Sequence, residues 1–547
     1  MKKLICLLCA AAMCLGMLAG CGTEAPSAPD SAPAPAEPTQ APAETPAPIA
    51  DGSAEAPASV EAPPVVESIF PLEETETLSL YYPWSPRFVE LGYDSPNDFK
   101  FFSELENRTN VHIDFTAVGA DIFSENFLLM MATQDYTDMY FNCTANYSGG
   151  ISKAIEDGAW LDLSEMMDRL APNYTALMDA DPDFYRANHT DEGAVGQFMQ
   201  YYENSFNQNG LVIRKDWLDA VEQDVPVTYD QWYDALCAIK NQYGLSNTLI
   251  TGAPESGFYN QTENGFVVKD GTVTCVWTDE AMAKPWLEIS KKWYEAGLFT
   301  SSALVKNGIP DQEGRSMVLS SEVAVFSVDI DLFPIYEEQL RDSGYVGTAV
   351  SRPVVNEGDT PYDAMQTIYG HGITISSACA DPELAVQWVD NFYTEDIELL
   401  ANYGTEGETF TYDADGVPHF TDMVLNDEDG LNFALFKYVV DWGPTVLDWN
   451  RKLDSYTEEQ LHTIDVWSDV DSSMVYPTFA TFTTEESAVI SEHYTDISTL
   501  VQEFQPKLIM GEMNLADFDE FVQMLEDAGL SEVTECYQNA YDRYMNR

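Results

Sequence analysis

The chain of 547 residues is poor in basic residues and rich in acidic ones. It contains 25 Lys and Arg against 92 Asp and Glu, which gives a formal net charge of −67. A nucleic-acid-binding surface needs basic side chains to neutralise phosphates, so nucleic acid is excluded as an expected partner. The same charge repels an anionic membrane surface or a polyanionic substrate over most of the molecule.

The chain also lacks the short motifs of several enzyme classes. It contains no HExxH, GxSxG, GxxxxGK[ST] or GxGxxG sequence, and these motifs mark zinc proteases, serine hydrolases, phosphate-binding loops and dinucleotide-binding loops. The five cysteines after Cys21 are widely spaced and form no CxxC pair, and the six histidines are scattered. We therefore expect no disulfide framework, no metal site and no cofactor.

After residue 20 the chain has no run of 18 or more apolar residues, the length that a membrane-spanning helix needs. The first twenty residues have a basic start, an apolar run over 4–17 and the small residues Ala19 and Gly20, a pattern that predicts an export signal over 1–20. The sequence Leu18-Ala-Gly-Cys21 resembles the lipobox of bacterial lipoproteins. That resemblance implies cleavage before Cys21, acylation of its sulfur, and a protein anchored by lipid on the extracellular side of the cell membrane.

Residues 21–74 are expected to form a linker between the lipid and the folded part. Between Gly22 and Pro64 lie 13 Ala, 11 Pro, seven acidic residues and no Lys or Arg. Such a composition cannot bury enough apolar area to fold. Because proline favours extended polyproline II structure, the segment is predicted to be a semi-rigid spacer.

From Leu78 onwards, strand-like and helical patterns alternate. They cover residues 78–82, 95–105, 111–115, 121–133, 138–141 and a helix opening at 146–150. Successive strand–helix units predict a mostly parallel, doubly wound sheet. Ligands of such sheets bind at the carboxyl ends of the strands, which is where Trp84 and the loop 142–150 are placed.

A second block of alternating patterns begins at Leu211. Its expected elements are a strand at 211–213, a helix after the capping box Thr228–Gln231, a helix over 285–297, a strand over 323–328, a helix from Asp381, and C-terminal helices to Tyr544. Trp232, Trp293 and Trp388 follow helical periodicity, so they are expected in the core. The sequence Asp413-Ala-Asp-Gly416 is too short for an EF-hand loop and predicts a hairpin turn.

Four passages form a recognisable set: Val212–Ala220 with Pro226–Trp232, Asp381–Tyr393, Tyr403–Glu408 with the turn Asp415–Gly416, and Phe504–Tyr544. Together they resemble family 1 extracellular solute-binding proteins, the lipoprotein receptors of ABC sugar importers. The third passage is similar to a loop of the family's oligosaccharide-binding branch. Glu222–Asp224 departs from the family, which often has a Gly-Leu turn there, but this leaves the expected fold unchanged.

The resemblance implies an α/β fold of two lobes, the type II periplasmic-binding fold. Each lobe would hold a doubly wound, mostly parallel sheet, with a hinged cleft between the lobes. Lobe 1 is expected over 75–200 and 370–402, and lobe 2 over 203–367 and 405–547. The implied protein is a monomer that captures a solute, in particular an oligosaccharide, and delivers it to ABC permease subunits in the membrane. No bond is made or broken.

Candidate ligand-binding residues come from strand ends and from the crossovers between lobes. Sugars present flat apolar faces and a rim of hydroxyls, so their sites combine aromatic rings with polar side chains. The candidates are Trp84, Asn146, Tyr147 and Ser148 in lobe 1, and Tyr202, Asp329, Asp331, Glu406 and Trp442 at the crossover and in lobe 2. Asn146 and Tyr147 align with a ligand-contact loop of maltose-binding relatives, where an acidic–basic pair is common, so that match is partial.

Two other functions stay open at this point. A lipid-anchored, glycan-processing enzyme is compatible with the composition, because among 92 acidic residues some carboxylate pair will lie within catalytic distance. A ligand-sensing receptor without transport would share the same fold. The acidic composition favours a neutral glycan over a polyuronate, unless Arg214 and Lys215 face the cleft; peptides and other solutes are further options.

Overall fold

The computed structural model describes residues 68–547 apart from Asn247, 250–264, 301–310, 366–368, 429–430 and 441–442. The predicted signal peptide (1–20), the lipidation site Cys21 and the linker up to residue 67 lie outside the described residues. Phe70 and Leu72 fall within the predicted linker, yet both pack against a buried apolar cluster. The folded part therefore begins before residue 75.

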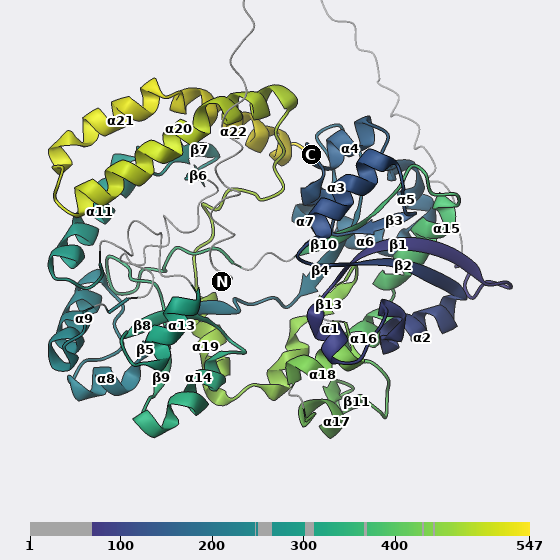
Figure 1. Cartoon of the computed structure of the whole chain (residues 1–547), viewed down its shortest axis with the longest axis horizontal. Coiled ribbons are helices and arrows are strands. Elements are labelled where there is room, and N and C mark those ends of the chain that lie inside the picture. Colours follow the sequence, from purple (N-terminus) through teal and green to yellow (C-terminus); the bar gives the residue numbers. More distant parts are fainter. Residues whose placement is uncertain are drawn as a thin grey trace, which may run out of the picture. The chain divides into compact units, whose positions relative to one another are not determined.

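A six-stranded sheet has the order β13-β4-β10-β3-β1-β2 (Figure 1). Pairs β1–β2, β1–β3 and β4–β13 are parallel, whereas β10 runs antiparallel to both β3 and β4. The mostly parallel sheet predicted for the first block is therefore confirmed. Its strands are β1 (Glu76–Trp84), β2 (Val111–Gly119), β3 (Met139–Phe141), β4 (Phe198–Glu203), β10 (Tyr369–Ile375) and β13 (Val446–Asp448).

The central strands of this sheet bury both of their faces. Successive side chains of a strand point to opposite faces, and along β1 Leu80 and Tyr82 belong to one apolar cluster while Tyr81 belongs to another. In β3 Met139 and Phe141 join the first cluster and Tyr140 the second. The two clusters are the cores between the sheet and its helices.

The helices that follow these strands begin where the sequence provides caps. Ser95 caps a short 3-10 turn (Pro96–Asp98) in a capping box with Asp98, as its pattern predicts, but the α-helix starts only at Lys100 because Phe99 is extended, with ψ 133°. The helices of this part are α1 (Pro86–Glu90), α2 (Lys100–Thr109), α3 (Phe123–Thr133), α4 (Gly150–Glu156), α5 (Ser164–Leu170), α6 (Pro172–Ala180), α7 (Pro182–Asn188), α15 (Pro382–Asp390) and α16 (Glu395–Tyr403).

A second sheet has three strands in the order β8-β5-β9: β5 (Asn209–Arg214), β8 (Val325–Asp329) and β9 (Gly347–Val350). Here β5 runs antiparallel to both neighbours, unlike the mostly parallel pairing expected for this sheet. The strand β5 follows β4 of the six-stranded sheet directly in the chain, and helices separate β5 from β8 and β9. A hairpin of β6 (Phe266–Lys269) and β7 (Thr272–Cys275) lies nearby in the sequence.

Helices cover both faces of the three-stranded sheet. Leu211 and Ile213 of β5 pack into one apolar cluster and Val212 into another. The helices of this part are α8 (Lys215–Ala220), α9 (Tyr229–Tyr243), α11 (Glu280–Glu295), α13 (Asp311–Leu319), α14 (Phe333–Leu340), α19 (Glu458–Ser468), α20 (Thr484–Ile509), α21 (Phe518–Asp527) and α22 (Leu530–Met545). Among the described residues, no helix combines the length and the apolar character needed to cross a membrane.

The helix expected to begin at Pro285 begins at Glu280 instead. Asp279 caps it by accepting hydrogen bonds from the backbone of Ala281 and Met282, and Pro285 lies inside the helix. A side-chain cap satisfies otherwise unpaired backbone N–H groups, which sets the start of the helix at the aspartate rather than at the proline. Trp232, Trp293 and Trp388 are at most 1% exposed, as their periodicity predicts.

The chain after residue 405 was expected to belong entirely to lobe 2, but part of it packs on the six-stranded sheet. The hairpin of β11 (Phe410–Tyr412) and β12 (Pro418–Phe420) contains the predicted turn and is followed by α17 (Asp422–Leu425) and α18 (Leu431–Tyr438). Phe436 of α18 contacts the ring of Phe88 at 5.7 Å, and β13 then pairs with β4. The chain thus returns to the six-stranded sheet before it continues through the 3-10 helix Trp449–Ser455.

The half-buried carboxyl of Glu398 makes stability depend on pH. Burial, with the nearby carboxylates of Glu203 and Asp448, raises the pKa of Glu398 to about 7. A raised carboxyl pKa contributes stability at low pH that is lost as the pH rises through the folded-state pKa. We expect Glu398→Gln to remove this loss, so that its melting temperature exceeds that of the wild type at pH 8 by on the order of 1–2 °C and matches it at pH 4.

Calorimetry at the two pH values checks this expectation, with Glu165→Gln on the exposed first turn of α5 as the matched control. Equal stabilisation of the Glu398→Gln variant at both pH values would contradict it.

Candidate functional site

The loop that follows β3 brings polar groups to the carboxyl edge of the six-stranded sheet. Asn142 and Gly149 both have positive φ, 55° and 88°. A Cβ on Gly149 would lie 2.6 Å from the Cβ of Lys153, so a glycine is required there. The tight turn places the exposed Ser148 immediately before α4.

Ser148 lines a groove of about 670 Å³, which we call the α4 groove. Its walls come from residues 148–156, Asp162 and 190–194 on one side and from 481–487 on the other. Hydroxyl and carboxylate groups dominate these walls. Lys153, a basic residue of the wall, is already paired with Glu156 at 3.2 Å and Asp157 at 2.6 Å.

A second groove, of about 470 Å³, is rich in aromatic rings, and we call it the tyrosine groove. Its aromatic lining residues are Tyr369, Tyr476, Phe479, Tyr541 and Tyr544. The rings of Tyr369 and Phe479 lie 5.1 Å apart. Among the described residues that line it, Asp183 is the one that carries a charged side chain. Flat rings with hydroxyls and little charge suit a neutral ligand that has apolar faces.

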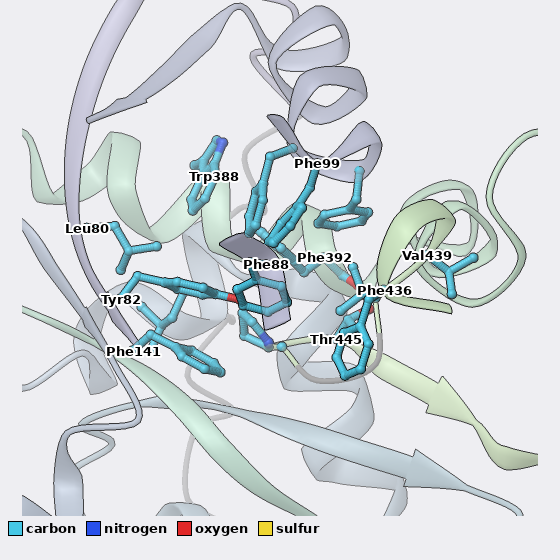
Figure 2. A pocket seen from close by; sticks show the side chains of 16 residues that line it. Leu80, Tyr82, Phe88, Phe99, Phe141, Trp388, Phe392, Phe436, Val439 and Thr445 are labelled. Atoms are coloured by element: carbon cyan, nitrogen blue, oxygen red, sulfur yellow. The ribbon is translucent and has the colours of Figure 1, made fainter. Parts of the chain in front are cut away.

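A third space, of about 40 Å³, lies within the six-stranded part of the chain (Figure 2). Rings from several elements converge on it, among them those of Tyr82, Phe88, Phe99 and Phe392. No charged side chain is present among its described lining residues. Sugar hydroxyls buried here would lose their hydrogen bonds to water without replacement, so we interpret this aromatic cavity as a packing defect of the core and not as a sugar site.

The predicted residues of the first lobe do not gather in one place. Trp84 is half-buried, with its ring 5.0 Å from that of Phe88, beside the aromatic cavity. The side chain of Asn146 accepts a hydrogen bond of 2.9 Å from Ser124. Tyr147 forms a 3.1 Å hydrogen bond with Asp157. Of these four candidates, Ser148 is the one that lines a groove.

Two predicted residues beyond the first lobe are connected through an aromatic cluster. The ring of Tyr202 lies 5.1 Å from that of Trp449, and Trp449 contacts Phe206, which contacts Tyr456. The Tyr456 hydroxyl donates a 2.8 Å hydrogen bond to Asp331. The carboxylate of Asp331 is also 3.3 Å from the largely buried ammonium of Lys452.

The remaining three candidates are separate from that cluster. The side chain of Asp329 accepts a 2.9 Å hydrogen bond from the backbone of Asp331. Glu406 is exposed and its backbone pairs with Phe410. Trp442 lies outside the described residues. A direct ligand contact by any of the nine candidates stays a prediction.

The residues of the tyrosine groove were not among the candidates. Tyr476 and Phe479 flank Pro477 in a segment with neither helical nor strand periodicity. Because no helix or strand periodicity explains aromatic residues in such a segment, their presence there was the signal in the sequence that could have indicated a binding surface. Within the part of the chain that the structure describes, no three His, Cys, Asp or Glu side chains gather in a geometry that could hold a metal ion.

Two curated proteins are similar to this chain in sequence. The fructooligosaccharide ABC transporter substrate-binding protein FusA of Streptococcus pneumoniae is 27% identical over 179 residues, 31% of this chain and 32% of FusA. Lipoprotein LipO of Bacillus subtilis is 23% identical over 493 residues, 82% of this chain and 90% of LipO. The match thus spans about a third of the first relative and nearly all of the second. No family model matches the chain.

Solved structures are similar over most of the chain. An HMO-binding, ABC-transporter-associated solute-binding protein of Bifidobacterium longum infantis matches with a TM-score of 0.67 at 18% identity, over 86% of this chain and 99% of that one. FusA of S. pneumoniae in complex with kestose matches with a TM-score of 0.62 at 19% identity, over 86% of this chain and 100% of that one.

The chain has the fold of the extracellular solute-binding proteins. This confirms the α/β, two-lobe fold expected from the sequence, and with it the resemblance that the four passages indicated. In this solute-binding fold, the six-stranded sheet belongs to one lobe and the three-stranded sheet to the other. Phe482 and helix α22 pack into the apolar cluster of the three-stranded sheet, so the 481–487 wall of the α4 groove and the α22 residues of the tyrosine groove lie beside that sheet.

The Asp331–Lys452 pair gives a prediction about stability. The Lys452 side chain is 11% exposed and that of Asp331 16% exposed. Removing the carboxylate leaves a largely buried ammonium without its counter-charge. We expect Asp331→Ala to lower the free energy of unfolding by about 1–3 kcal/mol.

Urea denaturation checks this value, with Asp415→Ala in the exposed hairpin turn as the control of equal charge change. A denaturation midpoint of Asp331→Ala equal to that of the wild type would show that the pair contributes nothing.

Proposed function

We propose that the protein is the substrate-binding protein of an ABC importer and that it captures a neutral oligosaccharide. The observation that carries the proposal is the similarity in fold, over 86% of the chain, to the HMO-binding protein and to FusA in complex with kestose. Both of those proteins are named for carbohydrate ligands. The solute-binding fold alone would also serve peptides, so the choice of a sugar needs support from the grooves.

The tyrosine groove supports a sugar of low charge. Tyr541 and Tyr544 of α22 face a groove that Tyr369 of β10 also lines. The two lobes therefore contribute rings to one space, and a ligand there can contact both. An aromatic ring can cover the apolar face of a pyranose or furanose, while tyrosine hydroxyls and Ser472 and Ser473 supply hydrogen bonds to its rim.

Capture by two lobes requires no chemical step. A ligand that contacts both lobes in one arrangement stabilises that arrangement by its differential affinity. We infer that the lobes meet through three connections: β4 to β5, the segment 351–368, and β13 to the helix that begins at Trp449. The closed arrangement is the form that the permease subunits would recognise.

The location of the protein follows from its first residues. We propose that Cys21 carries the lipid and that residues 22 to about 67 hold the folded lobes away from the extracellular face of the membrane. More than one acyl chain gives stable anchoring. The similarity to lipoprotein LipO supports this arrangement.

Titration of the non-lipidated mature chain with neutral oligosaccharides tests the proposed ligand class. We expect a fructan or another neutral oligosaccharide to raise the melting temperature saturably, because a ligand that binds only the folded state stabilises it by mass action. The sugar recovered from the mixture should have its original mass. A uronate oligomer of equal length should leave the melting temperature unchanged.

Recovery of a shortened sugar would contradict a binding role and indicate an enzyme. If no sugar stabilises the chain but a peptide does, the solute-binding fold stands and the ligand class is wrong.

Phe479 provides a second test of the sugar site. Its half-buried ring lines the tyrosine groove and contacts the ring of Tyr369. Loss of one aromatic ring from the site is expected to weaken the binding free energy by about 1.4 kcal/mol or more. Phe479→Ala should therefore raise the Kd for the best-binding sugar about tenfold or more.

Isothermal titration checks this value. The matched control is Tyr412→Ala, which removes a ring that is 44% exposed on the β11–β12 hairpin, outside both grooves. An unchanged Kd for Phe479→Ala would place the ligand elsewhere.

A further inference from the structure

A buried arginine cluster connects the two lobes between the grooves. Arg547 donates from all five of its N–H groups: two hydrogen bonds to Asp191 (2.9 and 2.7 Å), one to the Thr481 hydroxyl (2.7 Å), and one each to the carbonyls of Arg186 (3.1 Å) and Phe479 (3.0 Å). Its side chain is 2% exposed. The guanidinium therefore joins the segment after α7 in one lobe to the segment 479–481 in the other.

Arg543 of α22 extends the cluster. It donates a 2.8 Å hydrogen bond to Asp191 and a bidentate pair of 2.8 and 2.6 Å to Glu486. A fourth hydrogen bond, of 2.9 Å, reaches the carbonyl of Thr481. The Asp191 carboxylate, 14% exposed, thus accepts from two arginines. Charge-assisted, bidentate hydrogen bonds of this kind are stronger and more specific in geometry than neutral ones.

The cluster lies where the walls of both grooves meet. Asp191, Thr481 and Glu485 line the α4 groove, and Phe479 and Tyr544 line the tyrosine groove. Asp191 belongs to the six-stranded lobe, whereas Thr481 and Arg543 belong to the part that packs around the three-stranded sheet. Moving the lobes apart would separate Asp191 from both arginines and from Thr481.

We propose that Asp191, Arg543 and Arg547 form an interlobe latch that holds the groove walls together before ligand arrives. This inference rests on the proposed function only in taking the grooves as the ligand site. The latch raises the fraction of molecules in the binding-competent arrangement, and apparent affinity scales with that fraction. Asp191 and Arg547 act here as positioning residues, because they hold the walls and not the ligand.

Two conservative variants disconnect the latch without adding bulk. Asp191→Asn removes the charge that two arginines share. Arg547→Lys keeps the charge but offers three donors in place of five, without the planar fork. The double variant tests whether the two residues act as one unit. Asp396→Asn is the control, because Asp396 pairs with Arg108 at the surface, within the six-stranded lobe.

Small-angle scattering of the non-lipidated mature chain without ligand tests the latch itself. The N-terminal segment is common to all variants, so differences between them report on the lobes. We expect a larger radius of gyration for Asp191→Asn, for Arg547→Lys and for the double variant, and none for Asp396→Asn. Saturating sugar should return the latch variants to the wild-type value, and an unchanged circular dichroism spectrum without ligand would show that the larger radius comes from separated lobes and not from unfolding.

Affinity gives the second readout. Each single latch variant should raise the Kd for the best-binding sugar about fivefold to tenfold, and the double variant should raise it no further, because groups of one network are not additive. Wild-type scattering in the ligand-free variants, or additive losses of affinity, would overturn the latch. If no sugar binds even the wild type, the proposed ligand class fails, and the ligand-free scattering still decides on the latch.

Discussion

Side chains along β1 and β3 alternate between two separate apolar cores. The position of the α4 groove depends on this alternation. Leu80 and Phe141 are fixed in one core, Tyr81 and Tyr140 in the other. A slip of one residue would exchange the two sets, so the register is strongly specified. With the register fixed, β3 ends at Phe141 and the loop to Ser148 must leave the sheet at its carboxyl edge, which is the edge where parallel sheets bind their ligands.

The interface between the two sheets combines apolar packing with polar contacts. One apolar cluster joins Leu447 of β13 to Val212 of β5 and Phe326 of β8, whereas the aromatic cavity of Figure 2 lies entirely within the six-stranded part of the chain. Around the two grooves, the contacts are aromatic rings, hydroxyls and one arginine cluster. Polar contacts of this kind lose less on separation than an apolar core would, because water can replace them.

The net charge of the chain and the character of the tyrosine groove agree. An acidic molecule of −67 repels anionic solutes over long distances. Inside the tyrosine groove, by contrast, Asp183 is the one charged lining side chain among the described residues. Both features agree with the proposal of a neutral sugar ligand.

Local patterns in the sequence predicted the elements well but did not predict which loops would meet. The strands around Leu80 and Tyr140, the capping box at Thr228 and the buried tryptophans follow from periodicity and caps, which are local properties. The start of α11 was misplaced because Pro285 is a weaker local signal than the cap Asp279.

Three features depend on tertiary contacts across long stretches of chain. They are the antiparallel direction of β5, the pairing of β13 with β4, and the ion pair between Asp191 and Arg547. For the same reason, the sequence placed Ser148 at a groove but did not reveal the tyrosine groove.

Hydrogen exchange with and without the best-binding oligosaccharide tests the central claim most directly, because it locates the ligand on the mature chain without any substitution. When the sugar is bound, we expect slower amide hydrogen exchange in 472–481 and in the C-terminal turns of α22, and no change in α18 beside the aromatic cavity. Protection confined to α18 and α2, with none in 472–481, would contradict it.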